Sequence, residues 1–184
     1  MKRMRSVLFA TVVLGSGALV AAGEAVAGAA DHQAAFDRLK SLVGAWKGHH
    51  TTPDGPEMGV EYSLTGNGTA LTERLFAGTP HEMLSVYYME RGELVLTHYC
   101  AMGNQPRMKL VAGGKDGDLH FDFTGGTNLD AATSTYIHGG RISIPGPDRF
   151  DADWNVWSQG KQTDTHRLFM RRGCGREGPL VREP

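Results

Sequence analysis

The sequence predicts an all-β fold: an antiparallel up-and-down β-barrel of about ten strands with one short N-terminal helix. Short segments alternate apolar and polar residues, turn residues separate them, and most connectors are too short for parallel crossovers. The expected strands are 45–52, 57–64, 70–76, 81–90, 93–100, 107–112, 118–124, 134–144, 149–157 and 163–171. A long meander has two exposed edges unless it curls shut, so a closed barrel is favoured over the alternative, an open sandwich.

Residues 1–30 have the pattern of a secretory signal peptide. Three basic residues lie within the first five positions, the uncharged stretch Val7–Ala22 follows, and small residues then lead to cleavage positions after Ala27 or Ala30. The apolar run is short for a membrane-spanning helix, which leaves a retained anchor as the alternative. We therefore expect an exported protein, periplasmic or secreted, with no stable membrane insertion after signal cleavage.

The remainder of the chain has the size of one domain. We expect the barrel at residues 31–172 and a flexible tail at 173–184. The full sequence has 19 basic and 20 acidic residues, and cleavage would remove three basic residues and one acidic residue. The resulting mild acidity argues against nucleic acid and anionic membrane surfaces as partners. We expect a monomer.

A single helix is expected directly after the leader. Asp31 is placed to cap it, Phe36, Leu39 and Leu42 recur at helical spacing, and Gly44 is expected to end it. A helix this short is stable only when it docks on another element. We expect it to cover one mouth of the barrel.

Alternation along the strands indicates which side chains face inward. Aromatic residues at inward positions would form the walls of a lumen, and the candidates are Trp46, Tyr62, Phe121 and Trp154. Mostly apolar walls with few fixed polar groups are typical of sites for small molecules. The sequence therefore predicts a barrel that binds a small hydrophobic or amphipathic ligand in its lumen. A lumen filled by side chains, in a structural or interaction module, is an alternative.

The segment "LTHYCAMGNQPRM" carries the candidate polar end of this lumen. His98 and Cys100 share one strand face with two leucines, so His98 is expected to point inward. Burying an unpaired imidazole costs roughly 1–3 kcal/mol, so it needs a partner. We expect Asn104, Gln105 and Arg107 to fold back toward it. The group then anchors a ligand, or it is a structural network that fixes the hairpin.

The stretch "LKSLVGAWKGHH", a helix running into Gly44-x-Trp46 on the first strand, resembles the opening of the calycin superfamily, which includes lipocalins and fatty-acid-binding proteins. In lipocalins a basic residue of the last strand packs over this tryptophan. The resemblance implies that role for Arg167, Arg171 or Arg172. A guanidinium is suited to it, because it stacks on an indole face and bonds nearby carbonyls.

The blocks "LFAGTPHEMLSVYY" and "LVLTHYCAMGNQPRM" resemble a bacterial family of unknown function with a lipocalin-like fold, from about Leu39 to Arg171. The Gly-x-Trp-x-Gly form is also similar to nitrobindin-like barrels, in which a late histidine binds haem iron. That weaker similarity implies His166 as the candidate cofactor residue. Haem is thus an alternative ligand, and no other cofactor is expected.

Other chemistry finds little support in the sequence. No hydrolase, phosphate-loop or zinc-protease motif is present, so we lean against an enzyme and name no catalytic residue. The eight histidines show no chelating spacing, and no metal site is expected. The two cysteines, Cys100 and Cys174, fix no disulfide framework, and their pairing stays open.

Overall fold

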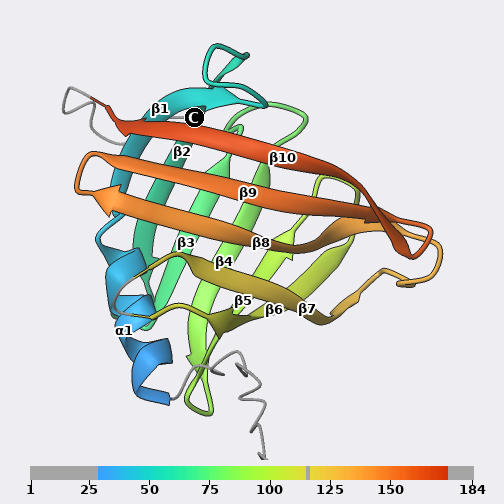
Figure 1. The fold of residues 1–184 in the computed structure, drawn as a ribbon, viewed down its shortest axis with the longest axis horizontal. Helices are drawn as coiled ribbons and strands as arrows, with labels where there is room; N and C mark the ends of the chain where they lie inside the picture. Colours follow the sequence, from blue (N-terminus) through green and yellow to red (C-terminus); the bar gives the residue numbers. More distant parts are fainter. Residues whose placement is uncertain (1–28, 115–116, 174–184) are drawn as a thin grey trace, which may run out of the picture.

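The computed structural model describes residues 29–114 and 117–173. Ten antiparallel strands close into a barrel, and one helix lies at one end of it (Figure 1). The elements are α1 (Ala29–Lys40), β1 (Gly44–His50), β2 (Glu57–Thr65), β3 (Ala70–Leu75), β4 (Met83–Glu90), β5 (Glu93–Tyr99), β6 (Gln105–Ala112), β7 (Leu119–Thr127), β8 (Thr135–Gly146), β9 (Arg149–Ser158) and β10 (Lys161–Arg172). The predicted fold class and all ten strands are confirmed.

Closure comes from the first strand, which pairs with both β2 and β10. In β1, Trp46 lies opposite Val60 of β2 on one side and opposite Arg172 of β10 on the other. Each remaining strand pairs with its sequence neighbours, as in an up-and-down meander. The described pairing is shortest between β5 and β6, where it covers Val95–Thr97 on β5, and the next shortest joins β7 and β8 through Leu119–Asp122 on β7.

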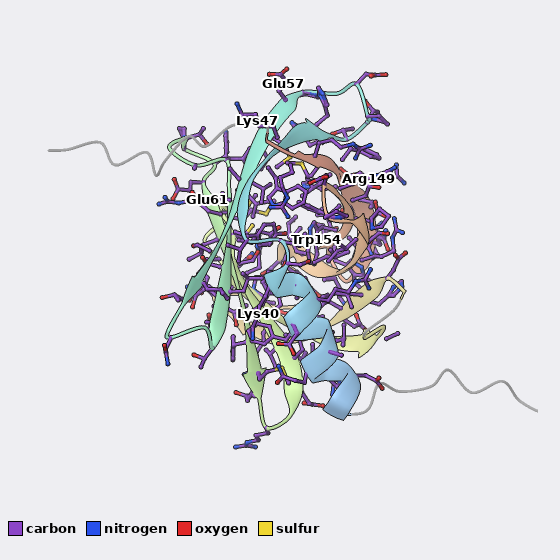
Figure 2. The ribbon with its side chains drawn as sticks, turned by 90° about the vertical axis from the view of Figure 1, so that its left-hand side faces the viewer. Lys40, Lys47, Glu57, Glu61, Arg149 and Trp154 are labelled. Atoms are coloured by element: carbon purple, nitrogen blue, oxygen red, sulfur yellow. The ribbon has the colours of Figure 1, made fainter. Side chains whose placement is uncertain are left out.

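Alternating burial follows the sequence pattern. In β2, Met58, Val60 and Tyr62 are buried, whereas Glu57 and Glu61 are exposed. Figure 2 shows the same division around the wall, with Lys47, Glu61 and Arg149 on the outside and Trp154 inside the barrel. Burial of the inward apolar side chains is the main force that holds such a sheet closed.

Helix α1 ends earlier than the sequence predicts. It stops at Lys40, and the amides of Ser41, Leu42 and Val43 each donate to the carbonyl three residues earlier. This tighter turn leaves the Leu42 carbonyl free for the Trp46 indole nitrogen, which donates to it at 2.6 Å. A tighter turn and this side-chain hydrogen bond thus take the place of a last α-helical turn.

Helix α1 closes one end of the barrel. The Arg38 guanidinium donates to the carbonyls of Gly117, in the β6–β7 connection, and Ile144, in β8. The His32 Nδ1 atom accepts a hydrogen bond from the Leu94 amide at 3.0 Å. These polar contacts fix the helix over its apolar interface with the lumen.

The contact implied for the first tryptophan is present. The Arg172 guanidinium carbon lies 4.4 Å from the centroid of the Trp46 ring, and the edge of Phe150 meets Trp46 with ring centroids 4.9 Å apart. Arg172 also donates to the carbonyls of Val43 and Ser41. One side chain therefore joins the last strand, the first strand and the helix end.

Residues 1–28, 115–116 and 174–184 lie outside the described part. The predicted signal peptide therefore lies outside it apart from Ala29 and Ala30, and the predicted tail apart from Gly173. Within the described residues, no helix has the length and apolar character needed to cross a bilayer.

Candidate ligand cavity in the barrel lumen

A cavity of about 690 Å³ occupies the barrel half opposite α1. Its rim comes from the β1–β2, β3–β4 and β5–β6 connections and from the start of β10, whereas α1 lies against the other end. The apolar lining residues are Leu75, Phe76, Met83, Leu96, Ala101, Met102, Met108, Ile137, Trp154, Val156 and Leu168. The remaining lining residues that the structure describes are His50, Thr51, Glu73, Thr79, His81, Ser85, His98, Cys100, Tyr136, Asp164, Thr165 and His166.

Four polar side chains form one row across adjacent strands, and we call Tyr62, Glu73, Ser85 and His98 the polar row. Tyr62 on β2 lies opposite Glu73 on β3, Glu73 lies opposite Ser85 on β4, and Ser85 lies opposite His98 on β5. Directly opposed residues on one face of a sheet are close enough to interact. Register alone therefore brings four residues from distant parts of the sequence into one hydrogen-bonded line.

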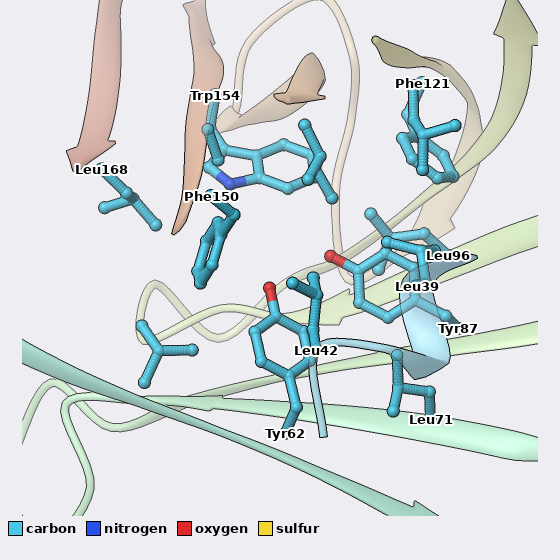
Figure 3. Close-up of a cluster of buried hydrophobic side chains, with 14 of the residues drawn as sticks. Leu39, Leu42, Tyr62, Leu71, Tyr87, Leu96, Phe121, Phe150, Trp154 and Leu168 are labelled. Carbon is cyan, nitrogen blue, oxygen red and sulfur yellow. The ribbon is translucent and has the colours of Figure 1, made fainter. Parts of the chain in front are cut away.

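Glu73 is the acidic residue at the centre of the polar row, with only 1 % of its surface exposed. The Tyr62 hydroxyl donates to Oε1 at 2.7 Å, and the Tyr87 hydroxyl donates to Oε2 at 2.9 Å. Figure 3 shows these two hydroxyl groups converging from different strands. Burial raises the pKa of Glu73, while the hydroxyls of Tyr62, Tyr87 and Ser85 act in the opposite direction.

His98 ends the polar row at the cavity wall, with 7 % of its surface exposed. Its Nδ1 lies 3.0 Å from the Ser85 hydroxyl oxygen. Its Nε2 is buried and finds no hydrogen-bond partner among the described residues. Burial lowers the pKa of His98 to about 4, so the imidazole is neutral at neutral pH. A neutral, half-satisfied imidazole at a cavity is a group that a ligand can complete.

The structure places some of the predicted site residues at the cavity. His98, Cys100, Trp154 and His166 all line it. Trp154 forms part of the apolar wall, and Cys100 lies half-buried near the rim. Cys174, the other cysteine of the possible disulfide, falls outside the described residues.

Asn104, Gln105 and Arg107, which were expected beside His98, lie elsewhere, and Ser85 is the hydrogen-bond partner of His98 instead. The Asn104 amide donates to the Thr135 carbonyl at 2.9 Å. The Thr127 hydroxyl of β7 donates to the Gln105 side chain at the start of β6, and Arg107 pairs with Glu90 on the outer surface. The physical reason is strand parity: β6 begins at Gln105 and buries Pro106 and Met108, so Gln105 and Arg107 share the opposite face.

Trp46, Tyr62 and Phe121 face inward, as expected, but do not line the cavity. Trp46 packs under α1, and Phe121 meets the edge of Tyr87 with ring centroids 5.9 Å apart. Tyr62 acts instead through its hydroxyl on Glu73. Strand parity in the sequence predicts which side chains face the lumen, but it does not predict how far along the barrel axis each one lies. These three aromatic residues were therefore expected at the cavity, whereas they lie in another part of the lumen.

Sequence reasoning missed Glu73 and Ser85. The available signal was parity: Glu73 lies between Leu71 and Leu75 on the inward face of a short strand, and an inward carboxylate is unusual. Ser85 likewise shares its face with Tyr87. What the sequence lacks is the register that joins them to His98.

No group of three or more potential metal ligands that could hold an ion occurs within residues 29–114 and 117–173. His50, His81 and His166 all lie at the rim, and the His166 Nε2 atom is 3.7 Å from the Asp164 carboxylate. The rim is therefore rich in imidazoles without a described chelating cluster.

The fold and the cavity define a class: a closed ten-stranded antiparallel barrel compatible with the calycin-like fold and with ligand binding in the lumen. Comparison with known proteins adds no family assignment, since no protein-family model matches the chain and no curated protein matches it significantly.

Proposed function

We propose that this protein is an exported barrel that binds a small, partly apolar molecule in the mouth half of its lumen. The lining supports this proposal, because leucine, methionine and tryptophan side chains form inner walls beside Glu73, Ser85 and His98, and further polar side chains lie toward the rim. Pockets for small molecules share this composition and lie in the same range of volume. The resemblances to calycins and to the bacterial lipocalin-like family, and the signal-peptide pattern, point the same way.

The observation that carries the proposal is the unpaired Nε2 of His98 at the wall of an apolar cavity. A buried polar atom without a partner costs about 1–3 kcal/mol. A structural network would satisfy both ring nitrogens, whereas this one satisfies only Nδ1, through Ser85. A ligand with one polar end and an apolar body would fill the space and complete the bond.

Native mass spectrometry of freshly purified protein, compared with its denatured mass, tests for a retained ligand. Titration with the neutral fluorescent probe N-phenyl-1-naphthylamine then tests the cavity directly. We expect Val156→Phe, which adds a ring to the cavity wall, to weaken probe binding at least about tenfold, or about 1.4 kcal/mol. The matched control is Val111→Phe, on the exposed side of β6.

Two outcomes would overturn the proposal. The first is wild-type protein that neither retains an additional mass nor binds the probe, as expected for a filled or purely structural lumen. The second is probe binding that responds equally to Val156→Phe and Val111→Phe, which would place the probe outside the lumen.

Haem binding is the second candidate, favoured by the position of His166 in the wall of the cavity. A haem needs an axial ligand and a large apolar space, and His166 is the residue that would hold the iron. It ranks second because no lysine or arginine occurs among the described lining residues to meet the haem carboxylates. Haem added to the protein should give a Soret band that His166→Ala removes. A spectrum unchanged by that substitution contradicts this assignment.

A further inference from the structure

We propose that the ligand presents a hydrogen-bond donor, such as a neutral hydroxyl or N–H group, to the Nε2 atom of His98, and that carboxylates are disfavoured. This inference rests on the proposed ligand-binding function and specifies the chemical class of the ligand. It follows from the direction of the hydrogen bonds along the polar row, starting at Glu73 and ending at the cavity.

The donor and acceptor roles along the polar row begin at Glu73. Both of its carboxyl oxygens accept from tyrosine hydroxyls, which is the pattern of an ionised carboxylate. The donors keep their protons, because burial and the neighbouring carboxylate raise the pKa values of Tyr62 and Tyr87 well above the ordinary range. Glu73 therefore acts purely as an acceptor.

Ser85 lies between Glu73 and His98, so the position of its single proton decides which atom donates in the Ser85–His98 hydrogen bond. Ser85 lies directly opposite Glu73 in the strand pairing, and its hydroxyl is one of the groups that lower the pKa of Glu73. A hydroxyl has only one proton to donate, and the proposal directs it to this carboxyl group. With that proton directed to Glu73, the Ser85 oxygen must accept in its contact with His98 Nδ1. The proton of the imidazole therefore lies on Nδ1.

A neutral imidazole carries one ring proton, so Nε2 is left with a lone pair. This atom accepts hydrogen bonds and cannot donate one. Since it has no partner among the described residues, a ligand that completes it must bring the proton. An ether or carbonyl oxygen placed there would set one lone pair against another.

The charges around the cavity act in the same sense. Glu73 and Asp164 line it, and the described lining includes no lysine or arginine. The basic groups available at the rim are the imidazoles of His50, His81 and His166. An anionic head group would therefore meet two carboxyl groups and no lysine or arginine among the described lining residues.

Competition between ligands of equal length tests the inference at pH 8. Bound N-phenyl-1-naphthylamine is displaced by 1-decanol, by its methyl ether or by decanoate. We expect 1-decanol to compete at least about fivefold better than the ether, which is the net contribution of one hydrogen bond, and better than decanoate. The advantage of 1-decanol over its methyl ether should be lost in His98→Leu and kept in Val111→Phe, on the exposed side of β6, with the affinity of each compound measured by calorimetry in each variant.

Glu73→Gln tests the direction of the polar row. The amide can donate to Ser85, which frees the Ser85 proton for His98 Nδ1 and moves the imidazole proton to Nε2. The preference should then shift from the alcohol toward the ether. Should this variant fail to fold, His98→Leu still decides the point.

The outcomes separate the two proposals. Absence of probe binding to the wild type overturns ligand binding itself. Probe binding in which the ether or decanoate competes as well as 1-decanol overturns only the assignment of a donor ligand. An alcohol preference that survives both His98→Leu and Glu73→Gln also overturns it, because the preference would then arise elsewhere.

Discussion

The two halves of the barrel share ten strands but differ in what fills them. In the half beneath α1, large side chains such as Trp46, Tyr62, Tyr87 and Phe150 are almost fully buried against one another. Figure 3 shows several of these rings meeting within the lumen. In the mouth half, the same sheet surrounds a cavity of about 690 Å³. One closed sheet therefore supports a packed core and a pocket at different levels.

The difference arises from single inward positions along a strand. On β4, Tyr87 fills the lumen, and Ser85, the next inward residue toward the mouth, leaves it open. On β5, the step from Leu94 to His98 exchanges an apolar contact for a polar group. Inward residue size sets whether a barrel of this strand number is solid or hollow. The packed half stabilises the fold, which frees the mouth half to leave His98 incompletely bonded.

The largest expected effect is on stability in the packed half. We expect Trp46→Ala to lower the free energy of unfolding by about 4–5 kcal/mol, since it removes a buried ring, the hydrogen bond to Leu42 and the partner of Arg172. Trp154→Ala should cost less, because that indole already borders open space and forfeits fewer contacts. Urea unfolding followed by far-UV circular dichroism measures both.

An equal or larger cost for Trp154→Ala would contradict this comparison. It would mean that the mouth half is packed as tightly as the half under α1. Both variants replace an inward-facing tryptophan with alanine. A difference in their free energies of unfolding therefore reflects the position of each tryptophan along the barrel axis.

A second effect concerns pH. The pKa of His98 is about 4 in the folded protein and about 6.5 when unfolded, so between these values the unfolded chain binds a proton that the folded chain excludes. The contribution of His98 is therefore complete above pH 6.5 and is lost as the pH falls toward 4. We expect wild type to lose roughly 2 kcal/mol more than His98→Leu between pH 7 and pH 5, measured by urea unfolding.

The contribution of Glu73 to stability changes with pH in the opposite direction. Its pKa is raised in the folded state, so its protonation at low pH stabilises the fold. It is present in wild type and in His98→Leu, so the difference between the two proteins isolates the histidine. Equal pH dependence in both would show that His98 is already open to water or paired with another group.

The fold could be predicted because its determinants are local. Alternation in segments such as Met58–Tyr62, turn residues and short connectors each follow from neighbouring residues, and closure then follows from the cost of free edges. The end of α1 was placed too late because residues 41–43 form a tighter turn, and Trp46 donates to the Leu42 carbonyl beyond it. Hydrophobic periodicity does not distinguish such a turn from a last helical turn.

The candidate site was predicted only in part for a related reason. His98 was found through its inward parity, but its partner was sought nearby in the sequence, at Asn104 and Arg107. The structure supplies Ser85, which is 13 residues away and one strand across. Pairing register sets such contacts, and it emerges from the whole sheet. The expected placement of Trp46 and Tyr62 at the pocket failed for a similar reason, because the position of a residue along the barrel axis also depends on the register.

The smallest expected effect belongs to the residue that the sequence placed beside His98 and the structure places outside. Arg107 pairs with Glu90 on the exposed surface of the barrel. Exposed ion pairs contribute little, so Arg107→Ala should change the free energy of unfolding by no more than about 0.5 kcal/mol. It should also leave N-phenyl-1-naphthylamine affinity unchanged, in contrast to Val156→Phe. A loss of probe affinity in Arg107→Ala would show that the hydrogen-bonded end of the pocket extends into the β5–β6 loop, and that the polar row is not its only anchor.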